Sequence, residues 1–164
     1  MEYESHAHPF APVFDENSRI LILGTFPSVK SRANAFYYGH PQNRFWKMLA
    51  VIYGEDAPVT IDEKKQFLLR RRLALWDVIA SCDIVGSGDS SIRNAVPNDL
   101  SQVLSAAPVR YILLNGQTAG KLFEKHNGGL QIARDILPST SPANAAWTIE
   151  KLALAWGEKL KAED

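Results

Sequence analysis

The 164-residue sequence has little cysteine, no net charge and no long apolar run. Its single cysteine, Cys82, excludes an intramolecular disulfide and disfavours a zinc or iron–sulfur site with cysteine ligands. Because 18 Lys and Arg residues balance 18 Asp and Glu residues, a non-specific nucleic-acid coat, a polybasic membrane binder and an acidic tail are disfavoured. No apolar run approaches the roughly 20 residues that span a bilayer, and residues 1–6 lack the features of a signal peptide. We therefore expect a soluble, cytoplasmic protein that binds no membrane.

The standard catalytic motifs are also missing. There is no glycine-rich phosphate loop of either standard spacing, no G-x-S-x-G elbow and no H-E-x-x-H. His6 and His8 fall in a segment that we expect to be a tail, His126 lies beside a helix stop, and only His40 falls in a promising loop. A site rich in amides, hydroxyls and aromatic rings remains, which suits a reaction that depends on positioning and electrostatics.

The residue patterns predict a single α/β domain over residues 1–164, with an extended coil at 1–18. Continuous apolar runs predict buried strands, and apolar residues at helical spacing predict helices. The predicted strands are 19–24, 73–79, 109–114 and 131–137, and the predicted helices are 43–53, 62–71, 97–106, 117–125 and 143–160, with a polar loop at 81–94. Their alternation predicts a three-layer α/β/α sandwich around a central parallel sheet of about four strands.

Ligands of such sheets bind at the carboxyl ends of the strands. Four polar segments stand at these ends, namely residues 24–28 (GTFPS), the loop after Asp77, Asn115 with Gly116, and residues 138–141 (PSTS). We expect the functional site among these loops.

The densest cluster of aromatic and amide side chains is residues 36–46 (FYYGHPQNRFW), just before a predicted helix. Aromatic faces beside amide groups suit a pocket for a flat heterocycle, because rings stack on a base while amides read its edge. We expect Phe45 and Trp46 to lie in the core and Tyr38 alone to face the pocket.

Three segments together resemble the uracil-DNA glycosylase superfamily. Residues 36–46 are similar to the H-P-x-N-R-F-W segment of mismatch-specific uracil-DNA glycosylases, and residues 24–28 stand in the place of their first motif, G-x-x-P-G/S. Residues 137–142 (LPSTSP) stand where the superfamily has its proline–serine motif. With L-W-D-V at 75–78, the combination most closely resembles the hypoxanthine-DNA (deoxyinosine) glycosylase branch, over residues 19–156.

Two departures from the superfamily pattern point to the same branch. Thr25 and Phe26 stand where most members have an Asp or Asn that positions the attacking water. The hypoxanthine branch also lacks that residue, and its catalytic Asn matches Asn43. Leu137 replaces the histidine that stabilises the departing uracil anion in classical uracil glycosylases, so the resemblance implies a base other than uracil.

The resemblance implies a monofunctional, monomeric hydrolase that acts on DNA containing a deaminated base, without a cofactor or a metal. It would flip out the nucleotide, most readily hypoxanthine, and cleave its N-glycosidic bond through an oxocarbenium-like sugar, leaving an abasic site. Asn43 is the candidate catalytic residue that orients water. The candidate base-binding residues are Gly24, Thr25, Phe26, Tyr38, Asp77 and Asn115, and the candidate DNA-binding residues are Pro27, Ser28, His40, Arg44, Ser139, Thr140 and Ser141.

Simpler roles remain open for several of these residues. Asn43 is also a favourable helix cap, Asn115 a common turn former, and Asp77 a possible partner of loop amides. Asp89 is expected only to shape its loop. Two other functions also remain open: a mismatch-specific uracil-DNA glycosylase, and a non-catalytic module that binds nucleotides or modified bases.

Overall fold

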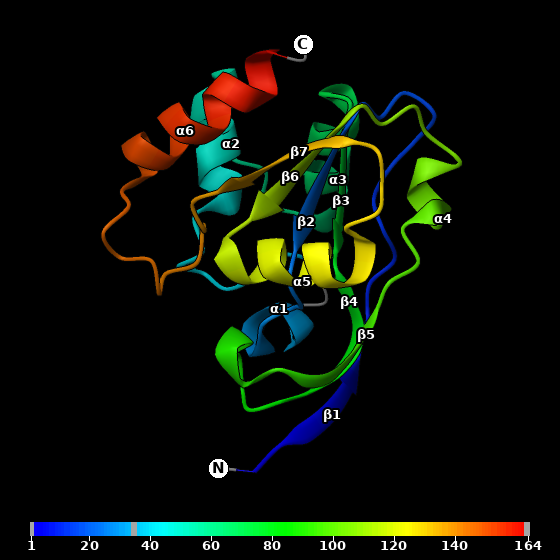
Figure 1. Ribbon diagram of the computed structural model, residues 1–164. Helices are drawn as coiled ribbons and strands as arrows, with labels where there is room; N and C mark the ends of the chain where they lie inside the picture. Colours follow the sequence, from blue (N-terminus) through cyan, green and yellow to red (C-terminus); the bar gives the residue numbers. More distant parts are fainter. Residues whose placement is uncertain (1, 34–35, 163–164) are drawn as a thin grey trace.

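Two sheets organise the protein in the computed structural model, which describes residues 2–33 and 36–162 (Figure 1). The parallel sheet has the strand order β3-β2-β6-β7, formed by Leu73–Asp77, Ile20–Gly24, Tyr111–Asn115 and Ala133–Leu137. The antiparallel sheet has the order β1-β4-β5, formed by Glu4–Ala7, Ile79–Ile84 and Arg93–Pro97.

Helices flank the parallel sheet, with α5 in front of it and α3 behind it in Figure 1. The helices are α1 (Val29–Ala33), α2 (Phe45–Tyr53), α3 (Ile61–Arg70), α4 (Ser101–Leu104), α5 (Gln117–Asn127) and α6 (Ile149–Ala162), with a short 3-10 helix, η1, at Asp89–Ser91. The predicted parallel sheet with covering helices is therefore confirmed.

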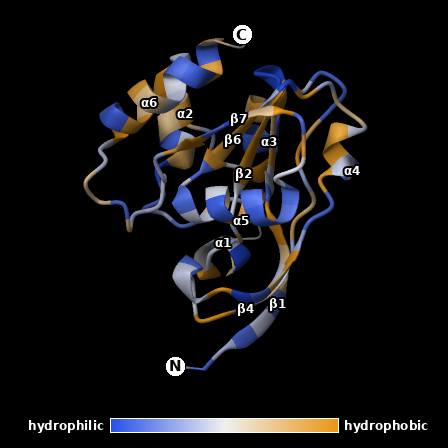
Figure 2. Ribbon diagram, in the orientation of Figure 1, coloured by the Kyte–Doolittle hydropathy of each residue, from blue (hydrophilic) through white to orange (hydrophobic). Residues whose placement is uncertain are grey.

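The central strand β2 explains why this prediction succeeds. All five of its residues are buried, and it pairs in parallel with β3 on one side and β6 on the other. A strand covered on both faces needs apolar side chains at every position, and this gives the continuous run seen in the sequence. Figure 2 shows apolar residues gathered on these strands and hydrophilic residues along α5.

The predicted coil at 1–18 is wrong in part, because Glu4–Ala7 forms an edge strand. It pairs antiparallel with β4, with Glu4 opposite Ile84 and Ala7 opposite Ser81. Three of its four side chains are exposed. Backbone hydrogen bonds rather than apolar burial hold this strand, so its sequence carries little signal.

The predicted strand at 73–79 and the loop at 81–94 are also corrected. The first sheet ends at Asp77 and the second begins at Ile79, so one residue separates strands of different sheets. The expected loop contains the rest of β4, η1 and the start of β5. The last helix begins at Ile149 rather than at 143, which leaves residues 143–148 as an irregular segment beside the strand ends.

None of the helices in the described part of the chain is long and apolar enough to cross a membrane.

Candidate active site

The carboxyl ends of the parallel strands open into a cavity of about 950 Å³. Every predicted site residue except Arg44 lines it, namely Gly24, Thr25, Phe26, Pro27, Ser28, Tyr38, His40, Asn43, Asp77, Asn115, Ser139, Thr140 and Ser141. Residues far apart in the sequence meet here because parallel strands place their following loops at one edge of the sheet.

Thr140 joins the two candidate amides of this cavity. Its Oγ1 donates to Asn43 Oδ1 at 2.9 Å and accepts from Asn115 Nδ2 at 3.0 Å. The Thr140 backbone N–H donates to Asn115 Oδ1 at 3.0 Å. Thr140 has no exposed surface, and its polar groups are used between the two asparagines rather than at the rim. The DNA contact that we predicted for it stays a prediction.

Asn43 lies in the cavity wall, and its side chain also contacts the backbone at the start of α2. Its Oδ1 accepts the backbone N–H of Phe45, the first residue of α2, at 3.0 Å as well as the Thr140 hydroxyl. The amide is therefore held in a fixed orientation through its oxygen, and its nitrogen is the group left to face a ligand. The capping role considered from the sequence is not the one observed, because the N-cap position of α2 is Arg44 and no side chain caps the helix there.

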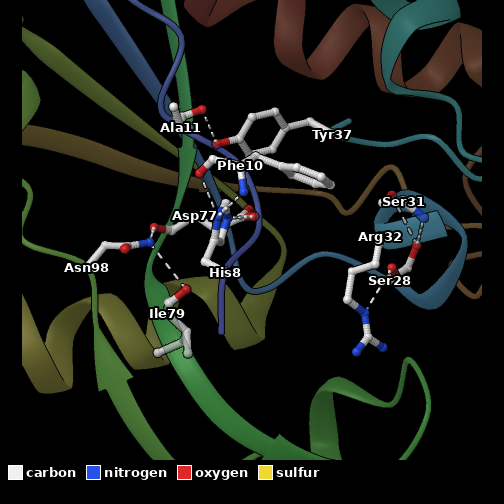
Figure 3. A network of polar contacts seen from close by, with 10 residues as sticks. All are labelled: His8, Phe10, Ala11, Ser28, Ser31, Arg32, Tyr37, Asp77, Ile79 and Asn98. Atoms are coloured by element: carbon white, nitrogen blue, oxygen red, sulfur yellow. Dashed lines mark hydrogen bonds and ion pairs between the residues drawn. The ribbon is translucent and has the colours of Figure 1, made fainter. Parts of the chain in front are cut away.

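His8 lies beneath the cavity, not in a tail. Its Nε2 is 2.8 Å from Asp77 Oδ2, and the two side chains are only 4% and 5% exposed. Its Nδ1 lies 2.8 Å from the carbonyl oxygen of Phe10. Figure 3 shows the ring enclosed by Asp77, Phe10 and Tyr37. No pattern in the sequence predicts this contact, because His8 follows a short edge strand and contacts a residue 69 positions away.

Tyr38 stands over the strand ends in an unusual backbone conformation. Its φ is +54°, and its ring stacks on Phe45 with centroids 4.2 Å apart. Its Oη is buried without a hydrogen-bond partner among the described residues. Burial, together with the nearby Asp77 carboxylate, raises the pKa of Tyr38 above its ordinary value, while Asn115 opposes the rise. The phenol is therefore a neutral donor at physiological pH.

The neighbouring aromatic residues agree with the sequence in part. Phe45 and Trp46 are buried in the core, as predicted. Tyr38 is not the only tyrosine of the cavity wall, because Tyr37 also lines it. The Tyr37 hydroxyl donates to the carbonyl of Ala11 at 2.9 Å, and this ties the N-terminal segment to the site.

Gly24 is the residue that allows Asp77 and Tyr38 to approach the end of β2. A Cβ atom at this position would lie 2.5 Å from Asp77 Oδ1 and 2.8 Å from Tyr38 Oη. Any side chain at position 24 would therefore displace both polar groups.

Asp89 was not predicted as a site residue, but it lines the cavity. The residue as a whole is exposed at the rim, yet partial burial of its carboxyl, reinforced by Asp77 and opposed by Thr25, raises its pKa to about 6. Its loop docks on α1, where Ser87 Oγ accepts the Val29 N–H at 2.8 Å. A serine- and glycine-rich loop has no periodic signal from which this placement follows.

Arg44, predicted to contact DNA, forms hydrogen bonds within the protein and does not line the cavity. Its guanidinium donates to the carbonyls of Ser141 at 2.7 Å and Asn144 at 3.1 Å, and to that of Trp147. Its Nε also lies 3.4 Å from the carbonyl of Thr140. These contacts occupy the charged group, so Arg44 holds the segment 140–147 in place.

The rim residues carry neutral hydrogen-bonding groups. Ser139 Oγ accepts the Ser141 N–H, and Ser141 Oγ accepts the Ala143 N–H, both at 3.1 Å. His40 Nδ1 accepts the Gln42 N–H at 3.0 Å.

No Lys or Arg is among the described residues that line the cavity. Over the same described ranges, no group of three or more His, Cys, Asp or Glu side chains is placed to hold a metal ion.

This geometry agrees with comparisons to known proteins. A family model described as "Uracil DNA glycosylase superfamily" matches residues 11–160. The chain belongs to the uracil DNA glycosylase superfamily. The matched range contains all four loops of the cavity, and the resemblance drawn from the sequence motifs is confirmed.

Two relatives of this chain are named hypoxanthine DNA glycosylase. The one from Methanosarcina barkeri (strain Fusaro / DSM 804) is 34% identical over 154 residues, which cover 93% of this chain and 96% of the relative. The one from Methanosarcina acetivorans is 39% identical over 137 residues, covering 82% and 86% of the two chains. A solution NMR structure of a protein from Methanosarcina acetivorans superposes with a TM-score of 0.81 at 34% identity, covering 95% of this chain and 97% of that chain.

Proposed function

We propose that this member of the superfamily is a DNA glycosylase that removes hypoxanthine from DNA. The observation that carries the proposal is the Asn43–Thr140–Asn115 network in the cavity wall, in a chain whose two relatives are named hypoxanthine DNA glycosylase. Such a network presents fixed amide groups to a flat heterocycle without adding net charge.

The reaction is hydrolysis of the bond between deoxyribose C1′ and purine N9. The nucleotide first leaves the duplex, at a cost of a few kcal/mol, because its reacting bond is inaccessible in the stack. The C1′–N9 bond then breaks with its electron pair on the purine, and a water oxygen bonds to C1′. The proton that the water loses balances the proton that the purine gains. An oxocarbenium-like sugar is strongly electrophilic, so water needs orientation more than deprotonation.

Asn43 is the residue that we assign to the water. Its oxygen is held by Thr140 and by the Phe45 N–H, which fixes the plane of the amide and directs the nitrogen. Positioning of this kind lowers the barrier because the reacting atoms need no further ordering.

The base is assigned to the inner part of the cavity. Tyr38 stacks on Phe45 with one face, and we assign its other face to the base. Asn115 and the backbone amides of Thr25 and Phe26 are assigned to the polar edge. Pro27, Ser28, His40, Ser139 and Ser141 at the rim are assigned to the flanking phosphates and sugars, without a metal or a cofactor.

The test is excision from a labelled duplex containing one deoxyinosine, with a matched uracil duplex beside it and EDTA in the buffer. Alkali-sensitive cleavage of the inosine strand is expected. Asn43→Ala should lower the single-turnover rate at least about 100-fold and leave binding of the duplex nearly unchanged. Excision of uracil at least about tenfold faster than excision of hypoxanthine would show that uracil, and not hypoxanthine, is the preferred substrate. Unchanged turnover in Asn43→Ala would remove that residue from the mechanism, and binding without turnover in the wild type would indicate a recognition module.

A further inference from the structure

The hydrogen bond between His8 and Asp77 connects the N-terminal segment to the wall of the cavity. His8 Nε2 donates to Asp77 Oδ2 at 2.8 Å, and both side chains are almost fully buried. The other ring nitrogen lies 2.8 Å from the Phe10 carbonyl and 3.2 Å from the Phe10 N–H. The rings of Phe10, Phe26 and Tyr37 surround the imidazole, with centroids 5.6, 6.0 and 5.7 Å away. The ring is therefore fixed on all sides.

The second carboxylate oxygen of Asp77 has a different environment. Oδ1 lies next to Gly24, near Tyr38 Oη, and Asp77 is part of the cavity wall. Among the described residues, none donates a hydrogen bond to Oδ1. Asn98 donates instead to the backbone carbonyl of Asp77, at 2.9 Å (Figure 3). One oxygen of the carboxylate is thus held by His8, and the other is available to a ligand.

A carboxylate oxygen in the wall of a cavity discriminates between bases by hydrogen-bond polarity. An ionised carboxylate only accepts hydrogen bonds. Hypoxanthine and the other 6-oxopurine and uracil-type lactams carry a ring N–H beside a carbonyl, whereas adenine has an unprotonated ring nitrogen at the same edge. A site that leaves a buried polar group unpaired rejects the wrong ligand strongly, because the group has already lost its hydration.

We infer that His8 is a positioning residue that orients Asp77, so that Asp77 Oδ1 accepts the ring N–H of a lactam base and rejects bases that lack it. This inference rests on the proposed function for the identity of the ligand. It assigns to the N-terminal segment a part in substrate selection, although this segment lies outside the motifs found in the sequence.

The test compares two otherwise identical duplexes, one with deoxyinosine and one with deoxynebularine, which lacks both the ring N–H and the 6-oxo group. Wild-type protein is expected to excise hypoxanthine at least about 100-fold faster than purine. Asp77→Asn replaces an acceptor by an amide that also donates, so this ratio should fall by about 100-fold. His8→Ala should lower the ratio at least tenfold, and His8→Gln, whose amide donates to Asp77, should restore part of it.

His6→Ala is the matched control, because His6 lies on the same segment and its side chain forms a hydrogen bond with the exposed Glu4, away from the cavity. It should leave both rate and ratio unchanged. Thermal unfolding of each variant separates loss of folded protein from loss of selectivity, since unfolding lowers both rates without changing their ratio. If His8→Ala does not fold, His8→Gln and Asp77→Asn carry the comparison.

Binding gives a readout that does not depend on turnover. Duplexes with 2′-fluorinated inosine or nebularine resist cleavage, and their affinities should show the same order among the variants. Absence of inosine excision by the wild type overturns the proposed function, and the binding ratio then still tests His8. Excision by the wild type with unchanged ratios in His8→Ala and Asp77→Asn overturns this inference alone.

Discussion

At the scale of single residues, the Thr140 hydroxyl has the most consequences, because two amides depend on it. Thr140→Val keeps the volume of the side chain and removes the partner of Asn43 Oδ1 and of Asn115 Nδ2. We expect a loss of about 1–3 kcal/mol in the free energy of unfolding and at least a tenfold loss in excision rate. Urea unfolding and single-turnover assays measure the two effects.

Thr148→Val is the control for this substitution. Thr148 is exposed and its hydroxyl caps α6 by accepting the Lys151 N–H at 3.2 Å. Its loss should lower stability by about 1 kcal/mol and leave excision unchanged. Equal losses of activity in the two variants would contradict a specific role for the Thr140 hydroxyl.

Asp89 gives a prediction about pH. Its pKa is about 6 in the folded protein against 3.8 as the ordinary value, so the folded state holds this proton over a range in which the unfolded chain has released it. The contribution of Asp89 to stability therefore falls as pH rises from about 4 to about 6 and stays low above that. Asp89→Asn removes the effect, and its melting temperature should exceed that of the wild type at pH 7.5 but not at pH 4.

Calorimetry at the two pH values tests the prediction, with Asp56→Asn, at an exposed position, as the control. A stabilisation by Asp89→Asn that is the same at pH 4 and pH 7.5 would show that the carboxyl is not the cause.

The site residues that were predicted and those that were missed differ in their surroundings in the sequence. Asn43 was found through the motif resemblance, and Asn115 because it stands at the carboxyl end of a strand with a clear apolar pattern. His8 and Asp89 were missed because their positions depend on an edge strand and on a docked loop. In both cases contacts with distant residues, rather than local pattern, decide where the side chain points.

At the scale of elements, the contacts of Arg44 explain how an irregular segment becomes a wall of the cavity. Arg44→Ala removes the donors for the carbonyls of residues 141, 144 and 147. We expect a loss of about 2 kcal/mol in stability, since hydrogen bonds to charged groups contribute about 1.5–3 kcal/mol. The amides of 141–147 should also exchange hydrogen faster than in the wild type.

Hydrogen exchange by mass spectrometry measures this effect, with Lys47→Ala, at an exposed position of α2, as the control. Arg44→Lys should recover only part of the protection, because an ammonium group lacks the planar fork that reaches several carbonyls. Unchanged exchange in Arg44→Ala would show that other contacts hold the segment.

The elements differ in how well their sequences predict them. β2 and β6 are buried on both faces, so each is a continuous apolar run. β1 and β5 expose most of their side chains and are joined to β4 mainly through the backbone. The apolar run at 73–79 looked like one strand because Val78 and Ile79 are as buried as β3 itself, and burial alone does not show that the chain changes sheet.

At the scale of the whole molecule, the balance of charge predicts how binding responds to salt. The chain has no formal net charge, and no Lys or Arg is among the described residues of the cavity wall. Few counterions are then released from DNA on binding, so the logarithm of affinity should fall against the logarithm of salt concentration with a slope of about −1 to −3. Fluorescence anisotropy between 50 and 200 mM salt measures the slope.

Arg44→Ala should leave this slope unchanged, because the Arg44 guanidinium already donates hydrogen bonds to the backbone carbonyls of residues 141, 144 and 147. A slope steeper than about −5 would show that several cations outside the cavity contact the phosphates.

The position of β1 has a practical consequence for handling the protein. His8 directly follows Ala7, the last residue of this strand. Figure 1 shows β1 and α6 at opposite ends of the molecule. An affinity tag or fusion partner joined ahead of β1 would lie next to the segment that carries His8 and would disturb its contact with Asp77. Recombinant protein for activity measurements is therefore best tagged beyond α6.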